Sequence, residues 1–555
     1  MIDRHFEHYY VNEKTIYVHD KPKNHDGKRK KGTHKIELLF GDGVEIDTKE
    51  LVEDEYKVHI DTLLEDEYTT ETKKQAKEAK KREAYMSRKY RDDSITSSGK
   101  DRPLGEVIPL VTSPTPKLEI YFIDVGQGDA IFIHTPTNKG ILIDGGPDNT
   151  AHKFLTKIYN LDSGNFLSKL FKLKKGRLVL DYVIMTHADD DHAKGLIEVF
   201  NNDKIIIKHI YHNGIAKFDG EKDKIGRRTP DGKLLTELFD DIDDFKLFDD
   251  IDDCHIVSKA VRKFKIRKFR LAKTNHILSR NFCNWVDAIK KAKERNRDLM
   301  IKRVDNKTDP DKIFNDLSRD EPDLNIEILG PINEGDSDNP KYRYFSNNDD
   351  AMTINGNSLS LRLTYGKCTT ILCGDMNDIS EKYLLAYCNE KKIDLHAHIF
   401  KANHHGSHKF SVEFLKSIKP GISVVSSGIP SGTDYGHPRA VLMACLGKYS
   451  NQNIERPVLF STKLSVGYAK FNTVKKFFNF KNIKDFFKTL SNYLRKSEDQ
   501  IKEDIPKMYK KLHDGTIYVR TDGETVVAAR LYGKKAKKWE AYKFYVDKHG
   551  TMVNA

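Results

Sequence analysis

Four metal-binding side chains lie within six residues of one another in the segment THADDDHAKGL. They have the spacing His187-x-Asp189-x-Asp191-His192 and directly follow an apolar run, Leu178–Met185, which predicts a buried strand. A strand that leads into a helix is a rigid place from which several ligands can converge. Imidazole nitrogens and carboxylate oxygens suit zinc, manganese or iron, and two closely spaced ions need carboxylates to offset their charge. The alternative is a solvated acidic turn with two incidental histidines.

Other strand-like runs in the chain also end in aspartate or histidine. Two runs upstream lead into glycine turns, and three runs downstream end in Asp or His residues. These ends are Asp124–Asp129, Asp144–Gly146, Gly374-Asp375, His404-His405 and, after one more run, His437. Apolar strands that each end in Asp or His are what a metal site on one edge of a β-sandwich requires. The repeated pattern therefore favours a metal centre over a solvated turn.

The motifs and their order resemble the metallo-β-lactamase fold, and specifically the branch similar to the hydrolase domain of the DNA-uptake protein ComEC. That branch carries DVGQGD, a DGG turn, H-x-D-x-D-H, N-S before a strand, GD, HHGS and GHP. The matching segments here are Asp124–Asp129, Asp144–Gly146, His187–His192, Asn357-Ser358, Gly374-Asp375, His404–Ser407 and Gly436–Pro438. The resemblance covers residues 117–460 and implies an α/β protein built on an αββα metallo-β-lactamase sandwich.

The chain also departs from the wider superfamily. A second histidine usually stands where Asp189 does, and a further mid-chain histidine usually serves the first metal. Asn355 or Asn357 lies nearest to that position here, and His212 is a less favoured replacement. The usual double glycine after the motif is Lys194-Gly195, which places a lysine near the mouth of the site.

We expect two divalent metal ions, zinc or manganese, that share a water, lower its pKa and polarise a phosphoryl or carbonyl oxygen. The expected ligands are His187 and Asp189 for one ion, and Asp191, His192 and either His404 or His405 for the other, with Asp375 bridging both. Of the two adjacent histidines we favour His405. Asp191 is also expected to orient the nucleophile.

Further residues are expected to support the reaction from around the ions. Asp144 would hold the distal N–H of a ligand histidine. His437 would protonate the leaving oxygen or bind phosphate, and Ser407 would add a hydrogen bond. The other candidates on the substrate side are Asp124, Gln127, Asp129, Asn357 and Lys194. For the DVGQGD turn, a tight turn that satisfies its own backbone is an equally good interpretation.

Composition indicates a cytoplasmic globular protein. Hydrophobic residues make up 38% and charged residues 32% of the 555 residues. No apolar run approaches the roughly 18–20 residues that span a bilayer, and the N-terminus lacks a basic-then-apolar signal pattern. The six cysteines show no C-x-x-C spacing, which favours a reducing compartment without a disulfide framework. Cys368 and Cys373 lie on predicted core strands.

The pattern along the chain suggests a modular organisation. Residues 1–93 are predicted to be a β-rich region followed by a charged helix at 71–93, and residues 94–116 a linker. The hydrolase domain spans 117–460 and contains a charged, helical insertion at about 203–345, where Leu235, Leu238, Ile242 and Phe245 recur at helical spacing. A basic C-terminal region of helix and β-hairpins covers 461–555.

The positive charge is concentrated near the C-terminus. Residues 461–555 hold 21 Lys and Arg against 10 Asp and Glu, which is +11 of the net +12. A polyanion would therefore be held mainly by this region. The candidate contacts are Lys534, Lys535, Lys537 and Lys538 in a predicted hairpin loop, together with Arg267 and Lys268 in a basic, aromatic stretch of the insertion.

These features favour a metal-dependent nuclease or phosphodiesterase that acts on nucleic acid. A small-molecule hydrolase, such as a lactonase, a phosphorylcholine-type esterase or a cyclic-nucleotide phosphodiesterase, is the alternative. A binding module with a silent site is a third interpretation, against which the retained Asp375 and His404-His405 argue.

Overall fold

The structure is a computed structural model of the whole chain. It describes residues 118–137, 139–159, 161, 178–219, 224–248, 268–272, 276–346, 349–428, 437–454, 457–462, 515–532 and 538–554, together with the backbone of seven strands between residues 6 and 109. None of the helices in these ranges combines the length and the apolar character needed to cross a bilayer.

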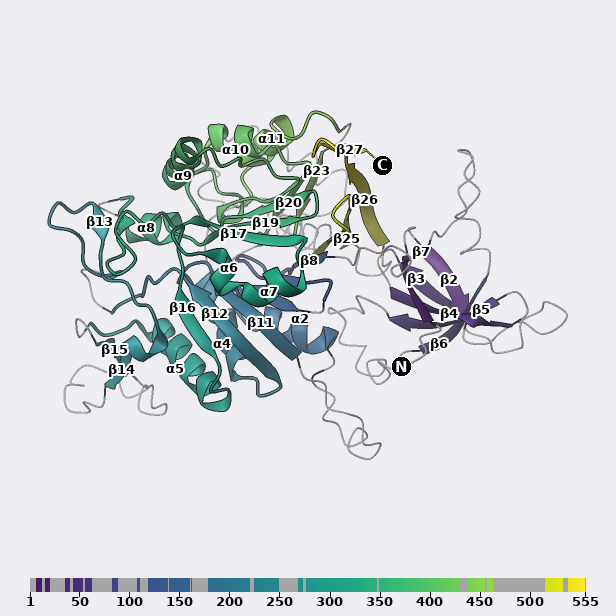
Figure 1. Cartoon of the computed structure of the whole chain (residues 1–555), viewed down its shortest axis with the longest axis horizontal. Coiled ribbons are helices and arrows are strands. Elements are labelled where there is room, and N and C mark those ends of the chain that lie inside the picture. The colour runs from purple at the N-terminus through teal and green to yellow at the C-terminus, as the bar shows by residue number, and fades with distance from the viewer. Residues whose placement is uncertain are drawn as a thin grey trace, which may run out of the picture.

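Two packed sheets with helices on both outer faces form the central body (Figure 1). The outer helices are α2 (Thr150–Ile158), α4 (Asp190–Asn201) and α5 (Arg280–Arg295) on one face, and α9 (Asp378–Lys391), α10 (Val412–Ile418) and α11 (Ala440–Lys448) on the other. Buried apolar side chains fill the space between the sheets and the space under each helical layer. The architecture is an αββα sandwich, so the expected fold class is confirmed.

The first sheet has ten strands and holds the H-x-D-x-D-H motif. Its strands, in sheet order, are β16 (Met300–Arg303), β12 (Ile205–His212), β11 (Leu178–Met185), β10 (Gly140–Ile143), β9 (Ile131–His134), β8 (Leu118–Phe122), β24 (Ile517–Thr521), β25 (Thr525–Tyr532), β26 (Lys538–Val546) and β27 (Met552–Asn554). From β10 to β16 the strands are parallel. The nearly continuous apolar sequence of β11 suits a strand that is covered on both faces.

The second sheet has six strands and supplies the downstream motifs. Its strands, in sheet order, are β17 (Leu324–Gly330), β19 (Ser360–Tyr365), β20 (Cys368–Leu372), β21 (Ile399–Lys401), β22 (Ile422–Val425) and β23 (Val458–Ser461). From β20 to β23 the strands are parallel. Because the carboxyl ends of parallel strands meet at one edge of a sheet, the residues that follow β20 and β21 lie close together. Cys368 and Cys373 are buried and free, as expected for core positions.

The C-terminal strands belong to the first sheet. β24 pairs with β8 in antiparallel register, Ile517 opposite Phe122 and Thr521 opposite Leu118. The strands β24–β27 therefore extend the sandwich itself, and the sandwich does not end at the expected boundary of residue 460. The helix expected in the C-terminal region 461–555 is not seen, because residues 463–514 lie outside the described ranges.

The region between β12 and β17 is less helical than expected. Leu235 lies in the two-residue strand β13 (Leu234–Leu235), which pairs with β18 (Tyr342–Arg343). A short 3-10 turn, η4 (Ile242–Asp244), leads into β14 (Phe245–Phe248), which pairs with β15 (Lys268–Leu271). The helical spacing of Leu235 to Phe245 was therefore misleading: these side chains are buried from a loop and short strands. The remaining helices after α5 are α6 (Pro310–Ile313), α7 (Asn315–Asp320) and α8 (Asp350–Gly356).

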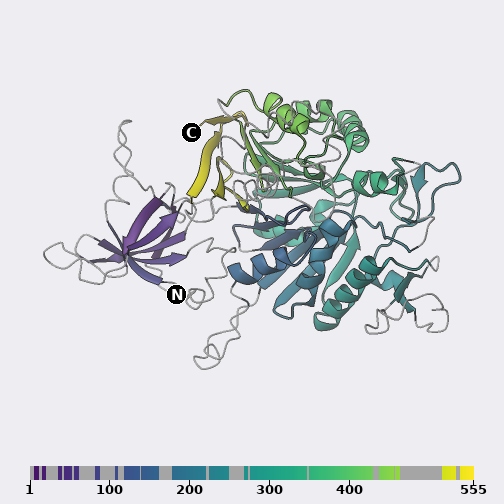
Figure 2. The same cartoon turned by 180° about the vertical axis from the view of Figure 1, so that it is seen from behind.

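The expected N-terminal β-rich region is a separate antiparallel sheet of seven strands, drawn in purple in Figure 1 and Figure 2. Its strands are β3 (Lys35–Leu39), β2 (Thr15–His19), β6 (Arg82–Ser87), β5 (Glu55–Asp61), β4 (Gly43–Val52), β1 (Phe6–Val11) and β7 (Val107–Pro109). Two expectations are corrected here. Part of the charged helix expected at 71–93 is strand β6, because pairing with β5 and β2 outweighs local helix propensity. Part of the expected linker 94–116 is the edge strand β7.

Candidate metal centre

Two glycine-containing turns, DVGQGD and DGG, pack against the H-x-D-x-D-H motif at the candidate site. The backbone N–H of Asp129 donates to the carbonyl of Asp191, and that of Gly145 donates to the carbonyl of His192. A Cβ on Gly128 would overlap the carbonyl oxygen of Asp191. Glycine is therefore required where the DVGQGD turn approaches the H-x-D-x-D-H motif, and this close approach brings motifs far apart in sequence together.

Asp129, His192, Asp375 and His405 converge on one buried point, with one ligand atom of each within 4.8 Å of the others. The Nε2 atoms of His192 and His405 are 3.2 Å apart. The Asp375 Oδ2 lies 3.3 Å from the first and 2.9 Å from the second. Asp129 and His192 lie on segments that follow strands β8 and β11 of the first sheet. Asp375 and His405 lie on segments that follow strands β20 and β21 of the second sheet. The cluster therefore lies where the two sheets meet.

Hydrogen bonds fix the orientation of both imidazoles in this cluster. The Nδ1 of His192 lies 2.8 Å from the Asp144 carboxylate, and the Nδ1 of His405 lies 3.0 Å from the carbonyl oxygen of Ser426. Because both partners are acceptors, each Nδ1 carries the proton and each Nε2 turns toward the cluster. Asp144, which has a left-handed φ of 58°, also accepts hydrogen bonds from the backbone and side chain of Thr186. Asp144 therefore joins Thr186 to the imidazole of His192.

The cluster strongly favours positive charge on its histidines. Burial lowers the pKa of both His192 and His405, but Asp375 and the neighbouring carboxylates outweigh burial and hold both pKa values well above the ordinary range. Burial raises the pKa of Asp375, and the two histidines lower it by more. The centre is thus a buried space built to bind positive charge.

Lys401 is a residue of this centre that sequence reasoning missed. Its ammonium is fully buried and contacts the Asp129 carboxylate, the Asp375 Oδ1 at 3.6 Å and the carbonyl oxygen of Gly374 at 3.0 Å. Burial lowers the pKa of Lys401, but Asp129 and Asp375 raise it above its usual value. A lysine in the middle of the apolar run IFKA is the signal that could have revealed it.

Asp129 also lies deeper in the centre than expected. Sequence analysis gave it a place on the substrate side or in a self-contained turn. Instead, its side chain is almost completely buried, contacts Lys401, and lies 3.5 Å from the Nδ1 of His405. Burial raises the pKa of Asp129, whereas Lys401 and His405 lower it below the ordinary value.

The remaining residues of the H-x-D-x-D-H motif surround the cluster. The Asp191 carboxylate lies 3.3 Å from the Nε2 of His405 and is one-third exposed, which places it between the cluster and solvent. The ring of His187 lies 4.0 Å from that of His192, and its Nε2 is 3.8 Å from the Asp189 carboxylate. The other oxygen of Asp189 binds Lys217 at 2.9 Å. The structure therefore brings His187 beside the cluster, while Asp189 is shared with a lysine.

The two adjacent histidines face different partners. Both adopt left-handed φ values, 49° for His404 and 51° for His405, in the short turn η6 (His404–Gly406). His405 belongs to the cluster, whereas the Nε2 of His404 lies 3.5 Å from the amide nitrogen of Asn355. Of the two, His405 is therefore the one that faces Asp375, and Asn355 lies opposite His404.

His437 lies next to His404, with ring centroids 5.6 Å apart. Its Nδ1 is 3.2 Å from the side-chain nitrogen of Gln127, so the DVGQGD turn and the GHP turn meet at the site. Burial and the neighbouring histidines lower the pKa of His437 to about 3. Asp124 accepts a hydrogen bond from the N–H of Gly126, as a tight turn requires.

Four other candidates have structural surroundings. The Asn357 amide donates to the carbonyls of Arg343 and Thr353, so it closes the end of α8. His212 is buried, its ring centroid lies 4.1 Å from that of Phe239, and it is not among the four clustered donors. The Ser407 hydroxyl accepts from the N–H of Lys409. Lys194 is exposed on α4, beside Lys217.

The proposed nucleic-acid contacts stay predictions. Lys534, Lys535, Lys537 and Arg267 lie outside the described residues, and the side chains of Lys538 and Lys268 are not described.

The donor set fits a divalent transition metal. Buried Asp129 Oδ1, Asp375 Oδ1 and His187 Nε2 have no hydrogen-bond partner. The Nε2 atoms of His192 and His405 face each other across 3.2 Å. Because both Nδ1 atoms carry a proton, both Nε2 atoms present lone pairs. A shared cation or an added proton is therefore needed between them. Nitrogen and carboxylate donors in this arrangement suit zinc or manganese.

Residues 123–261 match the family model of the metallo-beta-lactamase superfamily. The αββα sandwich and the cluster at the junction of its sheets agree with this match to a metallo-β-lactamase domain. A segment of 94 residues is 33% identical to ComE operon protein 3 of Bacillus subtilis (strain 168). That similarity covers 16% of this chain and 11% of the relative, so the chain matches about a tenth of that protein's length. The similarity agrees with the resemblance seen in the motifs.

Proposed function

We propose that this protein is a metal-dependent phosphodiesterase that cleaves the backbone of nucleic acid. The buried cluster of Asp129, His192, Asp375 and His405 carries the proposal, because its donors match a divalent metal and its two halves come from different sheets. The motif resemblance to a DNA-uptake hydrolase supports a polynucleotide substrate. We further propose two ions, with His187, Asp189 and Asp191 completing the ligand set.

Each residue has a defined part in this proposal. Divalent ions held here would polarise a phosphoryl oxygen and lower the pKa of a water. Asp144 and the Ser426 carbonyl keep the two cluster imidazoles turned inward. The Gln127 amide donates to Nδ1 of His437, which leaves the proton on Nε2, where the neutral imidazole can donate a hydrogen bond to a phosphoryl oxygen. Lys217, beside Asp189, adds positive charge next to the motif.

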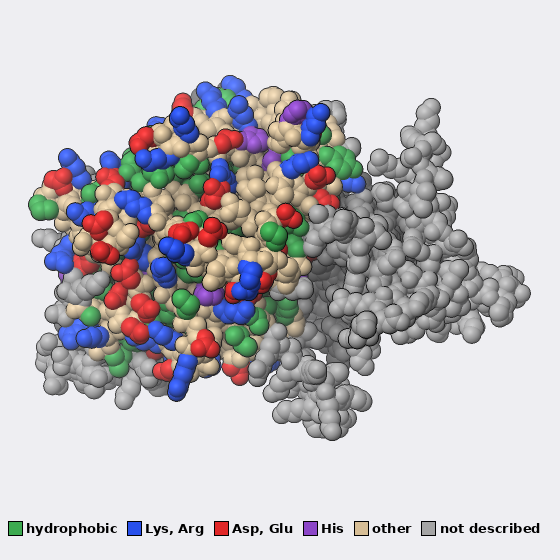
Figure 3. All heavy atoms as spheres, in the orientation of Figure 1, with side chains coloured by type: hydrophobic (Ala, Val, Ile, Leu, Met, Phe, Trp, Pro, Cys, Tyr) green, Lys and Arg blue, Asp and Glu red, His purple; other side chains and the backbone are tan. Residues whose placement is uncertain are grey.

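The surface charge of the visible face is mixed. On the face drawn in Figure 3, acidic and basic side chains are interspersed over the described residues. That face therefore offers no broad surface of one sign to a polyanion, and the excess charge of residues 461–555 is the main general attraction that we propose for nucleic acid.

A substrate screen of the metal-reconstituted full chain tests the proposal. The substrates are single- and double-stranded DNA, RNA, bis-p-nitrophenyl phosphate, a lactone and a phosphorylcholine ester. We expect cleavage of polynucleotide and of the small phosphodiester, both lost in Asp191→Ala/His192→Ala, with metal content measured alongside. Hydrolysis of the lactone or choline ester without any cleavage of polynucleotide would instead assign the site to a small-molecule hydrolase.

A further inference from the structure

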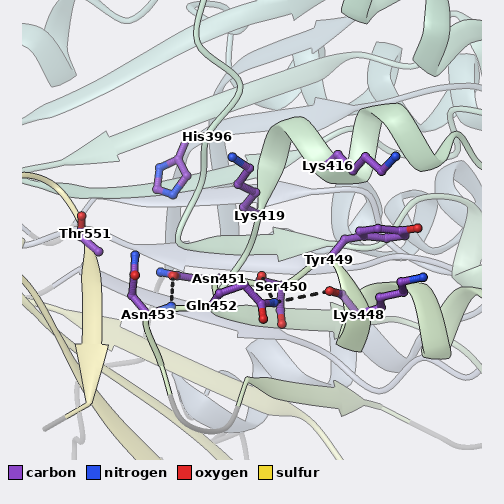
Figure 4. A pocket seen from close by; sticks show the side chains of 10 residues that line it. All are labelled: His396, Lys416, Lys419, Lys448, Tyr449, Ser450, Asn451, Gln452, Asn453 and Thr551. Atoms are coloured by element: carbon purple, nitrogen blue, oxygen red, sulfur yellow. Dashed lines mark hydrogen bonds between the residues drawn. The ribbon is translucent and has the colours of Figure 1, made fainter.

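A second charged feature lies at the other edge of the six-stranded sheet. It is a cavity of about 710 Å³ between the ends of α10 and α11 and the turn that precedes β23 (Figure 4). His396 lines it just before β21, whereas Asp375 and His405 follow the carboxyl ends of β20 and β21. The cavity is therefore separated from the candidate metal centre by the length of the strands.

Three lysines give this cavity its charge. Lys416 lies in the last turn of α10, Lys419 follows that helix, and Lys448 ends α11. None of the residues that line the cavity is acidic. Within the described ranges, no carboxylate lies within 4.0 Å of any of the three ammonium groups. Glu413, one turn earlier on α10, interacts electrostatically with Lys416 but forms no ion pair with it.

Two of these lysines lie against one aromatic ring, and hydrogen bonds fix the turn that follows it. The ammonium groups of Lys416 and Lys448 lie 5.3 Å and 5.4 Å from the ring centre of Tyr449, one above and one below it in Figure 4. Asn451 accepts from the N–H of Asn453 and donates to the carbonyl of Met552, so the turn is tied to β27. The cavity is thus formed by the fold itself, because its walls are joined by hydrogen bonds.

Neutral polar side chains complete the lining. Gln452, Asn453 and Thr551 supply amide and hydroxyl groups that both donate and accept hydrogen bonds. Lysine ammonium groups are compact point charges that bind phosphate oxygens. A volume of this size accommodates a small organic ligand and exceeds what one phosphate needs.

We propose that this cavity binds the phosphate groups of a nucleotide, either free or at the 5′ end of a polynucleotide. A nucleoside di- or triphosphate carries about as many negative charges as the cavity has lysines, and its sugar and base match the amide-bearing wall. The site goes beyond the proposed phosphodiesterase activity, since it shares no residue with the metal cluster and needs no metal.

Binding of fluorescently labelled ATP to the full chain, with a chelator present, tests this proposal. The variant is Lys416→Gln/Lys419→Gln/Lys448→Gln. The matched control, Lys302→Gln/Lys312→Gln/Lys382→Gln, removes the same charge from exposed lysines that do not line the cavity. We expect the cavity variant to bind at least about tenfold more weakly than the wild type, and the control variant to bind within about twofold of it.

Competitors distinguish the two sources of the phosphate groups. Displacement by a 5′-phosphorylated oligonucleotide, but not by its 5′-hydroxyl counterpart, assigns the site to a chain end, and displacement by ATP alone assigns it to free nucleotide. Equal displacement by sulfate at matched ionic strength, or wild-type affinity in the cavity variant, would overturn the proposal. Turnover of bis-p-nitrophenyl phosphate should be the same in all three proteins, so failure here leaves the phosphodiesterase proposal standing.

Discussion

At the scale of single residues, the candidate centre is a balance of buried charges. The carboxylates of Asp129, Asp144 and Asp375 are almost completely buried, and they are compensated by His192, His405 and Lys401. Removal of one partner of a buried ion pair leaves an uncompensated charge. Substitutions here should therefore separate residues that bind metal from residues that only balance charge.

Asp375 should matter more than either adjacent histidine. Its Oδ2 faces both cluster imidazoles, so we expect Asp375→Asn to lower the metal content and to lower the kcat by more than the roughly 10–100-fold that loss of a residue supporting a metal ligand costs. His405→Ala should have a smaller effect, because Asp129, His192 and Asp375 remain as donors. His404→Ala should retain metal, because its Nε2 faces Asn355. Elemental analysis and kcat for bis-p-nitrophenyl phosphate check this, and a metal-loaded, active Asp375→Asn protein would rule out a ligand role.

Lys401 should stabilise the protein most when metal is absent. Lys401→Met keeps the length of the side chain but leaves Asp129 and Asp375 without their buried cation. We expect a loss of about 3–5 kcal/mol in chelated protein, and a smaller loss after reconstitution, because a metal ion then supplies positive charge. Urea unfolding with and without metal measures both values. Lys217→Met is the control, since its pair with Asp189 is partly exposed and should be worth about 0–1 kcal/mol.

At the scale of elements, close backbone approaches position the motifs. α4 lies against the DGG turn so tightly that a Cβ on Gly195 would overlap the carbonyl oxygens of Gly145 and Asp148. We expect Gly195→Ala to cost about 1–3 kcal/mol or more and to lower activity, because the helix that carries His192 must shift. Gly447→Ala, in α11, meets nothing within 4 Å and should stabilise by about 0.5–1 kcal/mol. Equal thermal stability of the two variants would contradict this reading of the packing.

Helix α9 supports the histidine turn through a buried acid. Glu381 accepts hydrogen bonds from the Asn403 amide and from the N–H of Ser411, and burial raises its pKa from 4.5 to about 8. The folded state therefore holds this proton more tightly than the unfolded state does. The stability that the protonated acid contributes is fully present below about pH 4.5 and is lost as the pH rises through about 8.

Glu381→Gln should remove this pH dependence. The variant loses one acceptor, which costs about 1–3 kcal/mol at every pH, but it has no proton to release. We expect the free energy of unfolding of the wild type to fall toward that of the variant as the pH rises from about 5 to about 8. Urea unfolding of both proteins across this range measures the difference. Parallel pH profiles would mean that Glu381 ionises in the folded protein as it does in water.

At the scale of the whole molecule, local patterns predicted the sandwich and most of its site. Apolar strands that end in Asp or His gave the positions of Asp144, His192, Asp375 and His405, because parallel strands bring their ends to one edge. Lys401 escaped notice because its role depends on Asp129, which lies 272 positions earlier in the sequence. Contacts between side chains that are distant in sequence produce no local pattern, so they cannot be predicted from the spacing of residues.

Long-range strand pairing was equally hidden. β24 pairs with β8, which lies almost 400 residues earlier in the sequence. The sequence of neither strand indicates which strand it pairs with. The spacing of Leu235 to Phe245 matched a helix, yet tertiary packing buries these residues from a loop and short strands. The spacing of apolar residues predicts that their side chains are buried. Whether a helix or a strand carries them depends on the length of the segment and on its tertiary contacts.

The same C-terminal region should supply affinity for polynucleotide without taking part in the chemistry. Residues 461–555 hold a net charge of +11, yet none of the proposed metal ligands. Each phosphate contact made by a lysine adds about −0.9 to the log–log salt slope on duplex DNA. We therefore expect the substitution of glutamine at Lys534, Lys535, Lys537 and Lys538 to weaken binding and flatten its salt dependence. Turnover of bis-p-nitrophenyl phosphate should stay nearly unchanged, because this small substrate needs only the metal centre.

Filter binding over a range of salt concentrations, beside the turnover assay, checks this expectation. The control variant Lys302→Gln/Lys312→Gln/Lys382→Gln removes exposed lysines from the sandwich and should leave the slope close to that of the wild type. If the four C-terminal substitutions leave both affinity and salt slope intact, the C-terminal lysines are simply solvated. The basic stretch at 259–270 would then be the next segment to test, since it holds seven Lys and Arg residues interleaved with Phe264 and Phe269.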